Sequence, residues 1–194
     1  FSGKLATTPT TFVGYTDLTA ETTILDVQRS GEDYLIVLKE SPFYAEGGGQ
    51  VGDTGLILSA DKKTVLAEVT DTKKQGDTHI HIARLIVPGV DAGTAVTAQV
   101  DERRRARIMP HHTGTHLMNT ALRSVLGTHI RQAGSYVGPD KLRFDFTHPK
   151  ALTREQLAQI EDKIKERIAH RDTVTKEEMS LEEAKKKGAL AFFA

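Results

Sequence analysis

The sequence contains no cysteine in its 194 residues. This excludes a disulfide framework and a Cys–His catalytic pair within the chain, and it fits an intracellular protein. No apolar run approaches the ~20 residues that a membrane-spanning helix requires, and no signal-peptide pattern opens the chain. We therefore expect a cytoplasmic protein, or one of an organelle, that has no membrane partner.

The chain also lacks net charge, because 26 lysines and arginines balance 26 aspartates and glutamates. Net charge therefore neither favours nor excludes a nucleic-acid partner, and only local clusters bear on the question. The most suggestive cluster is RRRAR (103–107), in which Arg103, Arg104 and Arg105 follow one another. Such a run can contact phosphate groups, or it can be a solvated helix face.

Both ends of the chain are unusual. It begins at Phe1 without a methionine, and it stops at the apolar segment GALAFFA (188–194). Natural termini are usually polar and frayed. We expect the chain to be a piece of a longer polypeptide.

The first hundred residues contain short β-rich runs separated by turns. Several short strands at regular spacing, with no helical period between them, predict a small β-barrel or a sandwich. The expected strands are TILDVQ (23–28), YLIVLK (34–39), GLILSA (55–60), TVLAEVT (64–70), THIHIARL (78–85) and TAVTAQVD (94–101). In the fifth of them His79 and His81 alternate with isoleucines, which predicts one apolar face and one polar face.

The pattern changes after Asp101. Residues 102–126 are mostly helix formers interrupted by Pro110 and Gly114, which predicts either one kinked helix or a short lead-in and a helix from about residue 111. Gly127 is a natural stop for this helix. A strand is expected at KLRFDF (141–146). The second half therefore reads as α+β.

Two more helices are predicted by capping boxes. Thr153 and Gln156 begin the first, whose expected core stripe consists of Leu157, Ile160, Ile164 and Ile168. Ser180 and Glu183 begin the second, which is expected to end at Gly188. Between them, Thr173 to Lys176 is expected to be a short strand.

His112 and His116 lie four positions apart in the first helix, so both imidazoles share one face. They can bind one metal ion, although zinc usually takes three or four protein ligands. The same spacing also occurs by chance on solvated faces. His129 and His148 lie in the same half of the chain without convincingly completing a ligand set, and the sequence alone does not place a carboxylate beside the pair.

The stretch SPFYAEGGGQVGDTG (41–55) is rich in glycine. Glycines let the backbone adopt positive φ and approach a ligand closely, and successive N–H groups can bind an anion. The stretch is neither a Walker loop nor a dinucleotide-binding fingerprint, because their required residues and context are missing. From the residues alone, a bulged turn between barrel strands is the favoured interpretation.

Two long segments together carry a family resemblance. SPFYAEGGGQVGDTG (41–55) and HHTGTHLMNTALRSVLGTHIRQAGSYVGPDKLRFDF (111–146) strongly resemble the editing region of alanyl-tRNA synthetase, and freestanding alanyl-tRNA editing proteins share the same unit. The resemblance implies an α+β protein. Residues 1–100 would form a small β-barrel with the glycine-rich motif, and residues 101–194 an α+β editing core, incomplete at its C-terminus, similar to that of threonyl-tRNA synthetase.

The resemblance implies an aminoacyl-tRNA hydrolase within an alanine–tRNA ligase. Such an editing site hydrolyses the ester of serine or glycine wrongly attached to tRNA for alanine, because a pocket that accepts alanine excludes these two amino acids poorly. The expected partners are tRNA for alanine and the other domains of the parent synthetase. Alternatives are a freestanding trans-editing deacylase and a non-catalytic tRNA-binding module that kept the fold.

The resemblance also implies zinc. The family site uses a His-x-x-x-His pair and a later Cys-x-x-x-His pair, and His112 and His116 match the first. The chain stops at KKKGALAFFA (185–194), which resembles a segment upstream of the second pair. We therefore expect the zinc site to be incomplete here, with the missing ligands beyond Ala194.

Further site residues follow from the resemblance. Gln132, in RQAGS, matches a glutamine of the aminoacyl pocket, and Thr113 and Thr115 can hydrogen-bond the substrate hydroxyl or a water, or simply pack on the helix. No general base is evident. The family usually has Asn where this chain has His111. The residues expected to approach the tRNA are Gly47, Gly48, Gly49, Gln50 and Asp53 of the glycine-rich motif, of which Asp53 alternatively caps a turn, together with the arginines 103–105.

Overall fold

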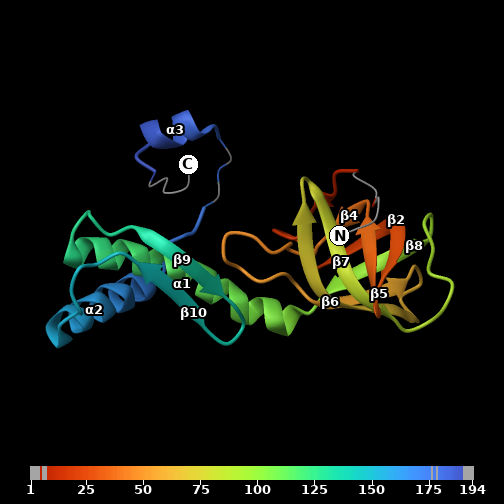
Figure 1. Cartoon of the computed structure of the whole chain (residues 1–194), viewed down its shortest axis with the longest axis horizontal. Helices are drawn as coiled ribbons and strands as arrows, with labels where there is room; N and C mark the ends of the chain where they lie inside the picture. The colour runs from red at the N-terminus through yellow and green to blue at the C-terminus, as the bar shows by residue number, and fades with distance from the viewer. Residues whose placement is uncertain (1–4, 6–7, 176, 178, 190–194) are drawn as a thin grey trace. The chain divides into compact units, whose positions relative to one another are not determined.

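A computed structural model describes residues 5, 8–175, 177 and 179–189 of the chain (Figure 1). These residues divide into two compact units. Unit 1 takes the described residues up to His111 together with Tyr136–Lys141, and unit 2 takes His112–Ser135 and the described residues from Leu142 onward. The boundary expected after residue 100 coincides with the end of the last barrel strand, whereas the compact units part within the helix that follows.

Unit 1 is built on a closed antiparallel barrel of six strands in the order β2-β3-β7-β6-β5-β8. This decides between the barrel and the sandwich that the sequence left open. The short strands β1 and β4 pair in parallel outside the barrel. The bounds of these strands are β1 Thr11–Phe12, β2 Thr19–Ser30, β3 Asp33–Leu38, β4 Glu40–Ser41, β5 Gly55–Ser59, β6 Val65–Gln75, β7 Thr78–Leu85 and β8 Ala95–Val100.

The long strand β2 closes the barrel. Its first part, Thr19–Thr23, pairs with β8, and its second part, from Ile24 on, pairs with β3. The pairing register shifts between Ile24 and Asp26, and a bulge of this kind bends a strand enough for it to serve two neighbours. Gly31, with φ of 66°, supplies the left-handed residue of the tight turn into β3.

Strand β7 differs from its prediction, because both of its faces are buried. His81 is fully buried, and neighbouring Ala83 belongs to the apolar core of the barrel. Ile80, on the opposite face, is fully buried in a second cluster with Leu5, Leu35 and Val37. The polar face therefore turns into the barrel and the isoleucine face packs outside it. Alternation showed that the faces differ, but not which one meets the core.

The helix α1 (Glu102–Leu126) is continuous, which confirms the first of the two predicted alternatives. Pro110 removes the N–H that would bond the carbonyl of Ala106, and both residues are exposed, so water can replace the lost partner. Gly127 follows the helix with φ of 113°, a conformation that favours glycine.

Unit 2 contains α1 from His112 onward, β9 (Gln132–Val137) up to Ser135, β10 (Leu142–Phe146), α2 (Arg154–His170) and α3 (Leu181–Lys186). Strands β9 and β10 form a two-stranded sheet. Both predicted capping boxes, Thr153 with Gln156 and Ser180 with Glu183, are confirmed. The predicted strand at 173–176 is wrong for residues 173–175, and residue 176 lies outside the described residues. The core of unit 2 consists of Ala121, Leu122, Ile130, Phe144 and Ile160 with partly buried neighbours.

The predicted stripe of α2 is only half buried. Ile160 is 7% exposed and Ile164 packs against the core, whereas Leu157 is 47% and Ile168 62% exposed.

Within the described residues, no helix has the length and apolarity that crossing a membrane would require.

Candidate functional site

His112 and His116 are neighbours on α1 in unit 2. Their ring centroids lie 5.3 Å apart with the rings tilted by 52°. The pKa of His112 is lowered, chiefly by burial and further by the nearby charge of His116. Both effects favour the neutral imidazole, which is the form that binds a metal ion. The pair therefore fits half of a zinc shell.

The other half of such a shell is not found in the part of the chain that the structure describes. Among these residues no group of three or more His, Cys, Asp and Glu side chains is placed to hold a metal ion. Two imidazoles supply two of the three or four protein ligands that zinc sites use. The donors fit zinc in kind but not in number.

The proposed catalytic side chains also lie in unit 2. Thr113 and Thr115 flank Gly114 on α1, and all three are half-buried. A Cβ at Gly114 would lie 3.1 Å from the side chain of Leu142, so this turn of the helix runs close to β10. Gln132 is the first residue of β9 and is half-buried. Thr113, Thr115 and Gln132 remain candidates on these grounds.

The glycine-rich stretch is a closed loop of unit 1 between β4 and β5. At its base, the Asp53 N–H donates to the Tyr44 carbonyl at 2.9 Å, and the Tyr44 N–H donates to Asp53 Oδ2 at 2.8 Å. The Tyr44 hydroxyl also donates to the Gly47 carbonyl at 3.1 Å. Asp53 therefore holds the base of the loop through both its backbone and its side chain.

The tip of the loop is a tight turn. Gly47 and Gln50 exchange backbone hydrogen bonds of 3.2 and 3.0 Å, and the two residues between them, Gly48 and Gly49, have φ of 59° and 83°. Two consecutive left-handed residues define the turn that strongly prefers glycine at both positions. Gly48 and Gly49 are exposed, whereas Gln50 is only 6% exposed. The glycines are explained by backbone conformation, and the exposed tip is what a ligand can reach.

The loop is held against residues from the end of β9. The Val51 N–H donates to the Val137 carbonyl at 3.1 Å, and the Val137 N–H donates to the Gly49 carbonyl at 2.8 Å. Beside them, His111 Nδ1 lies 2.7 Å from the carbonyl oxygen of Gly138, so this nitrogen carries the donated proton. An asparagine amide can donate in the same way, which offers a physical reason for either residue at position 111.

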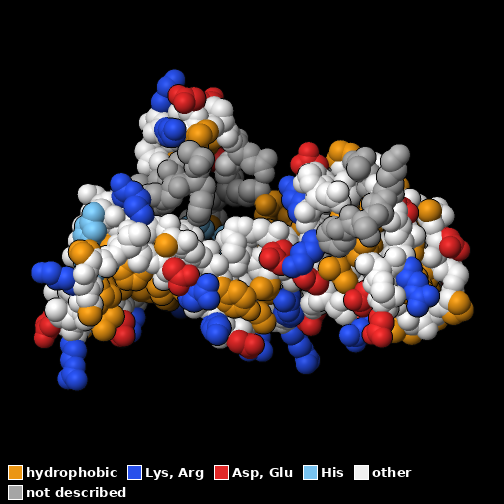
Figure 2. Space-filling view, in the orientation of Figure 1, with side chains coloured by type: hydrophobic (Ala, Val, Ile, Leu, Met, Phe, Trp, Pro, Cys, Tyr) orange, Lys and Arg blue, Asp and Glu red, His pale blue; other side chains and the backbone are white. Residues whose placement is uncertain are grey.

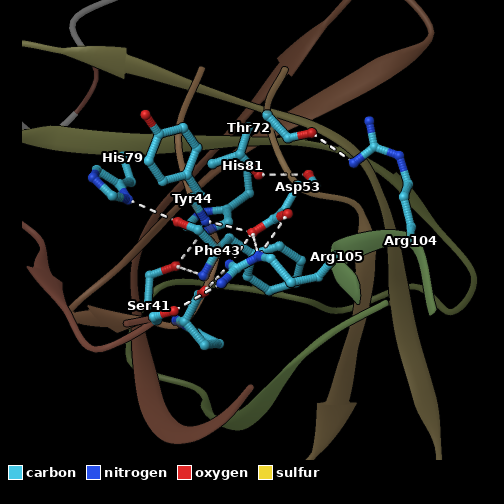
Figure 3. Close-up of polar contacts among 12 residues, drawn as sticks. Ser41, Phe43, Tyr44, Asp53, Thr72, His79, His81, Arg104 and Arg105 are labelled. Carbon is cyan, nitrogen blue, oxygen red and sulfur yellow. Dashed lines mark hydrogen bonds and ion pairs between the residues drawn. The ribbon is translucent and has the colours of Figure 1, made fainter. Parts of the chain in front are cut away.

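Arg105 and Asp53 form an ion pair inside unit 1 (Figure 3). Arg105 Nε lies 3.1 and 3.0 Å from the two carboxylate oxygens, and the guanidinium also donates to the carbonyls of Gly14 at 2.7 Å and Pro42 at 3.1 Å. Arg105 is 8% and Asp53 1% exposed. Since their polar atoms face inward, neither side chain is available for the tRNA contact that the sequence predicted for it.

The other two arginines of the run differ in exposure. Arg104 is half-buried and donates to the Gly52 carbonyl at 2.8 Å, so it braces the same loop, whereas Arg103 is exposed. Figure 2 shows Lys and Arg side chains interspersed with Asp and Glu on the face drawn, rather than gathered in one basic patch. Of the three predicted phosphate contacts, only Arg103 is exposed.

The barrel also contains a buried Ser–His pair that the sequence does not predict. Ser41 Oγ lies 2.7 Å from His81 Nε2, and His81 Nδ1 lies 2.9 Å from the carbonyl oxygen of Ile36, which makes Nδ1 the donor and Nε2 the acceptor. Burial lowers the pKa of His81 to about 4. Both side chains are fully buried, so no substrate reaches them and their role is structural. Ser41 and His81 are 40 positions apart in the chain, so no local sequence pattern predicts their contact.

Comparison with known proteins gives consistent matches. The family described as tRNA synthetases class II (A) matches residues 3–104, just over half of the chain. The alanine–tRNA ligase of Leptospira biflexa is 40% identical over 193 residues, which is 95% of this chain and 21% of the relative. Those of Bradyrhizobium diazoefficiens and Acetivibrio thermocellus are 48% and 42% identical over 85% and 95% of this chain. The chain spans about a fifth of the length of these relatives.

Proposed function

The chain belongs to the class II (A) tRNA synthetase family, and on that premise we propose that it is the editing region of an alanine–tRNA ligase. Its reaction is hydrolysis of the ester that joins a wrong amino acid, serine or glycine, to tRNA for alanine. We also propose that unit 2 has the fold of the threonyl-tRNA synthetase editing core.

One observation carries the proposal. Alanine–tRNA ligases align with 85–95% of the chain, and the aligned chain pairs His112 with His116 on one turn of α1. An editing reaction is needed because a pocket built for alanine rejects glycine and serine by only a small free-energy difference. A second site that hydrogen-bonds the extra hydroxyl of serine can discriminate strongly, since alanine offers it no partner.

In this reaction a water oxygen bonds to the ester carbonyl carbon, the bond to the tRNA oxygen breaks, and a proton passes to that oxygen. His112 and His116 would hold zinc together with ligands from further along the parent protein, and zinc supplies a Lewis acid that polarises a carbonyl or acidifies a water. Thr113 or Thr115 hydrogen-bonds the seryl hydroxyl or the attacking water. Gln132 orients the aminoacyl group. The proton acceptor is a positioned water or the terminal hydroxyl of the tRNA.

The tRNA contacts are assigned to exposed groups of unit 1. The tip of the glycine-rich loop, Gly48 and Gly49, has no side chains, so its backbone can approach the tRNA closely. Arg103 supplies a phosphate contact. Gly47 and Gln50 shape the tip, while Asp53, Arg104 and Arg105 hold its base.

The test uses the full-length ligase. His112→Ala with His116→Ala is expected to abolish deacylation of Ser-tRNA for alanine and to leave attachment of alanine to the tRNA intact. His170→Ala removes an exposed imidazole of α2 and is the matched control. Undiminished deacylation in the double variant would refute the assignment. So would a native ligase that binds the tRNA without releasing serine, since the chain would then be a binding module.

A further inference from the structure

A second histidine pair lies in unit 2, apart from the pair on α1. His129 Nε2 and His148 Nδ1 are 3.0 Å apart, and the two rings are stacked at a centroid distance of 5.3 Å. His129 lies in the loop between α1 and β9, and His148 follows β10. His129 is exposed and His148 half-buried, and Figure 2 shows imidazole surface on this unit. A dissolved ion can therefore reach the pair.

The backbone on both sides of the pair is held in place. Arg123 donates from Nη1 to the carbonyls of Thr128 at 3.1 Å and Ile130 at 2.8 Å, on either side of His129. The segment before His148 is tied to the same loop, because the Thr147 N–H donates to the Arg131 carbonyl at 3.0 Å. Ile130 is fully buried in the core of unit 2. The two imidazoles are thus brought together by fixed backbone and not by chance contact of long side chains.

We propose that His129 and His148 form a binding site for a divalent transition-metal ion of the Cu²⁺ or Ni²⁺ type. A contact between two imidazole nitrogens requires one of them to carry the shared proton, and a metal ion can take the place of that proton. Metal–nitrogen bonds of about 2.0–2.1 Å to atoms 3.0 Å apart meet at about 91–97°, after rotation of the rings toward the ion. This angle suits square-planar and octahedral ions better than tetrahedral zinc.

The site would join two chain segments that are 19 residues apart. Water completes the shell, because the described residues hold no third His, Cys, Asp or Glu close enough to form a cluster with the pair. Binding favours the folded state over the unfolded state, in which these histidines are not held together, so the ion stabilises unit 2. The inference is independent of the proposed editing reaction, because it uses neither His112 nor His116.

The experiment titrates Cu²⁺ into the full-length protein carrying His112→Ala and His116→Ala, which removes the α1 pair as a competing site. Among the bound ions we expect one equivalent whose electron paramagnetic resonance spectrum shows coupling to two imidazole nitrogens, together with a rise in the melting temperature of the protein. Adding His129→Gln and His148→Gln should remove that equivalent, the coupling and the thermal shift. Each single Gln variant should retain coupling to one nitrogen at most and bind at least about tenfold more weakly, a factor equal to 1.4 kcal/mol.

Two controls make the result decisive. His170→Gln removes another exposed imidazole of unit 2 and should change nothing. Circular dichroism of the His129 and His148 variants should match that of the protein that retains both histidines. If a Gln variant unfolds, the corresponding Asn variant is used instead. The proposal is overturned if the folded variant with both Gln substitutions binds Cu²⁺ with unchanged stoichiometry and spectrum. It is also overturned if the protein that retains His129 and His148 shows no coupling to two nitrogens.

Discussion

The carboxylate of Asp53 lies against the guanidinium of Arg105 in the interior of unit 1, although 52 residues separate them in the chain. The same guanidinium bonds the carbonyls of Gly14 and Pro42, and the same carboxylate bonds the N–H of Tyr44. One ion pair therefore joins the start of α1, the turn before β2 and the base of the glycine-rich loop. The ion pair therefore fixes the position of the glycine-rich loop, whose tip is proposed to contact tRNA.

Replacing Arg105 by Met should destabilise the protein by about 3–5 kcal/mol, because it leaves the buried Asp53 carboxylate without a counter-charge. Urea unfolding followed by circular dichroism measures the change. Arg103→Met is the control, since this exposed side chain should alter stability by no more than about 0.5 kcal/mol. Equal stability of the two variants would show that the ion pair does not hold the loop.

Local patterns in the sequence predicted local structure well. The barrel strands, the helix after Asp101 and both capping boxes depend on residues within a few positions of each other, and all were found. The exception is the strand at 173–175, where a short β-rich run has no partner strand among the residues that the structure describes. A strand needs a neighbour to satisfy its backbone, and propensity alone does not supply one.

Contacts between distant residues were not predictable in the same way. The sequence left open whether the arginine run contacts phosphates or forms a solvated helix face. The three side chains in fact lie in three different environments, because successive residues of a helix are rotated by about 100°. Likewise His81 meets Ser41 and Ile36 across two strands, which no spacing in the sequence reveals. The His112–His116 pair was predictable because one helical turn brings the two residues together.

Replacement by alanine should destabilise the protein at one glycine of the glycine-rich stretch and be tolerated at another. A Cβ at Gly52 would lie 2.2 Å from the Thr72 carbonyl oxygen, which belongs to the backbone and cannot move aside easily. We expect Gly52→Ala to cost about 3 kcal/mol of stability. At Gly47 the nearest atoms are 3.7 and 3.8 Å away, so Gly47→Ala should change stability by less than about 1 kcal/mol. Thermal unfolding distinguishes them, and similar losses for both would contradict the packing described.

Position 111 should tolerate asparagine better than leucine. His111 donates to the carbonyl of Gly138, a buried residue, and an Asn amide can replace that donor. His111→Leu leaves the carbonyl without it, at a cost of about 1–3 kcal/mol, whereas His111→Asn should cost well under half as much. Chemical denaturation of both variants measures the difference. If leucine proved as stable as asparagine, the hydrogen bond would not be what position 111 contributes.

Acid should weaken the barrel through His81. Burial lowers the pKa of His81 from 6.5 to about 4. Between pH 6.5 and about 4, His81 therefore binds a proton in the unfolded chain but stays neutral in the folded barrel. The full contribution of neutral His81 is therefore present above about pH 6.5 and is lost as the pH falls toward 4, a change of about 3 kcal/mol. The pKa of His79 is also lowered by burial, so His79 affects stability in the same direction.

Urea unfolding between about pH 7.5 and about 4.5 measures the loss of stability. His81→Gln, which does not titrate, should reduce this loss, whereas His170→Gln should not. An acid dependence that is identical in His81→Gln would mean that other groups, such as carboxylates, destabilise the protein in acid.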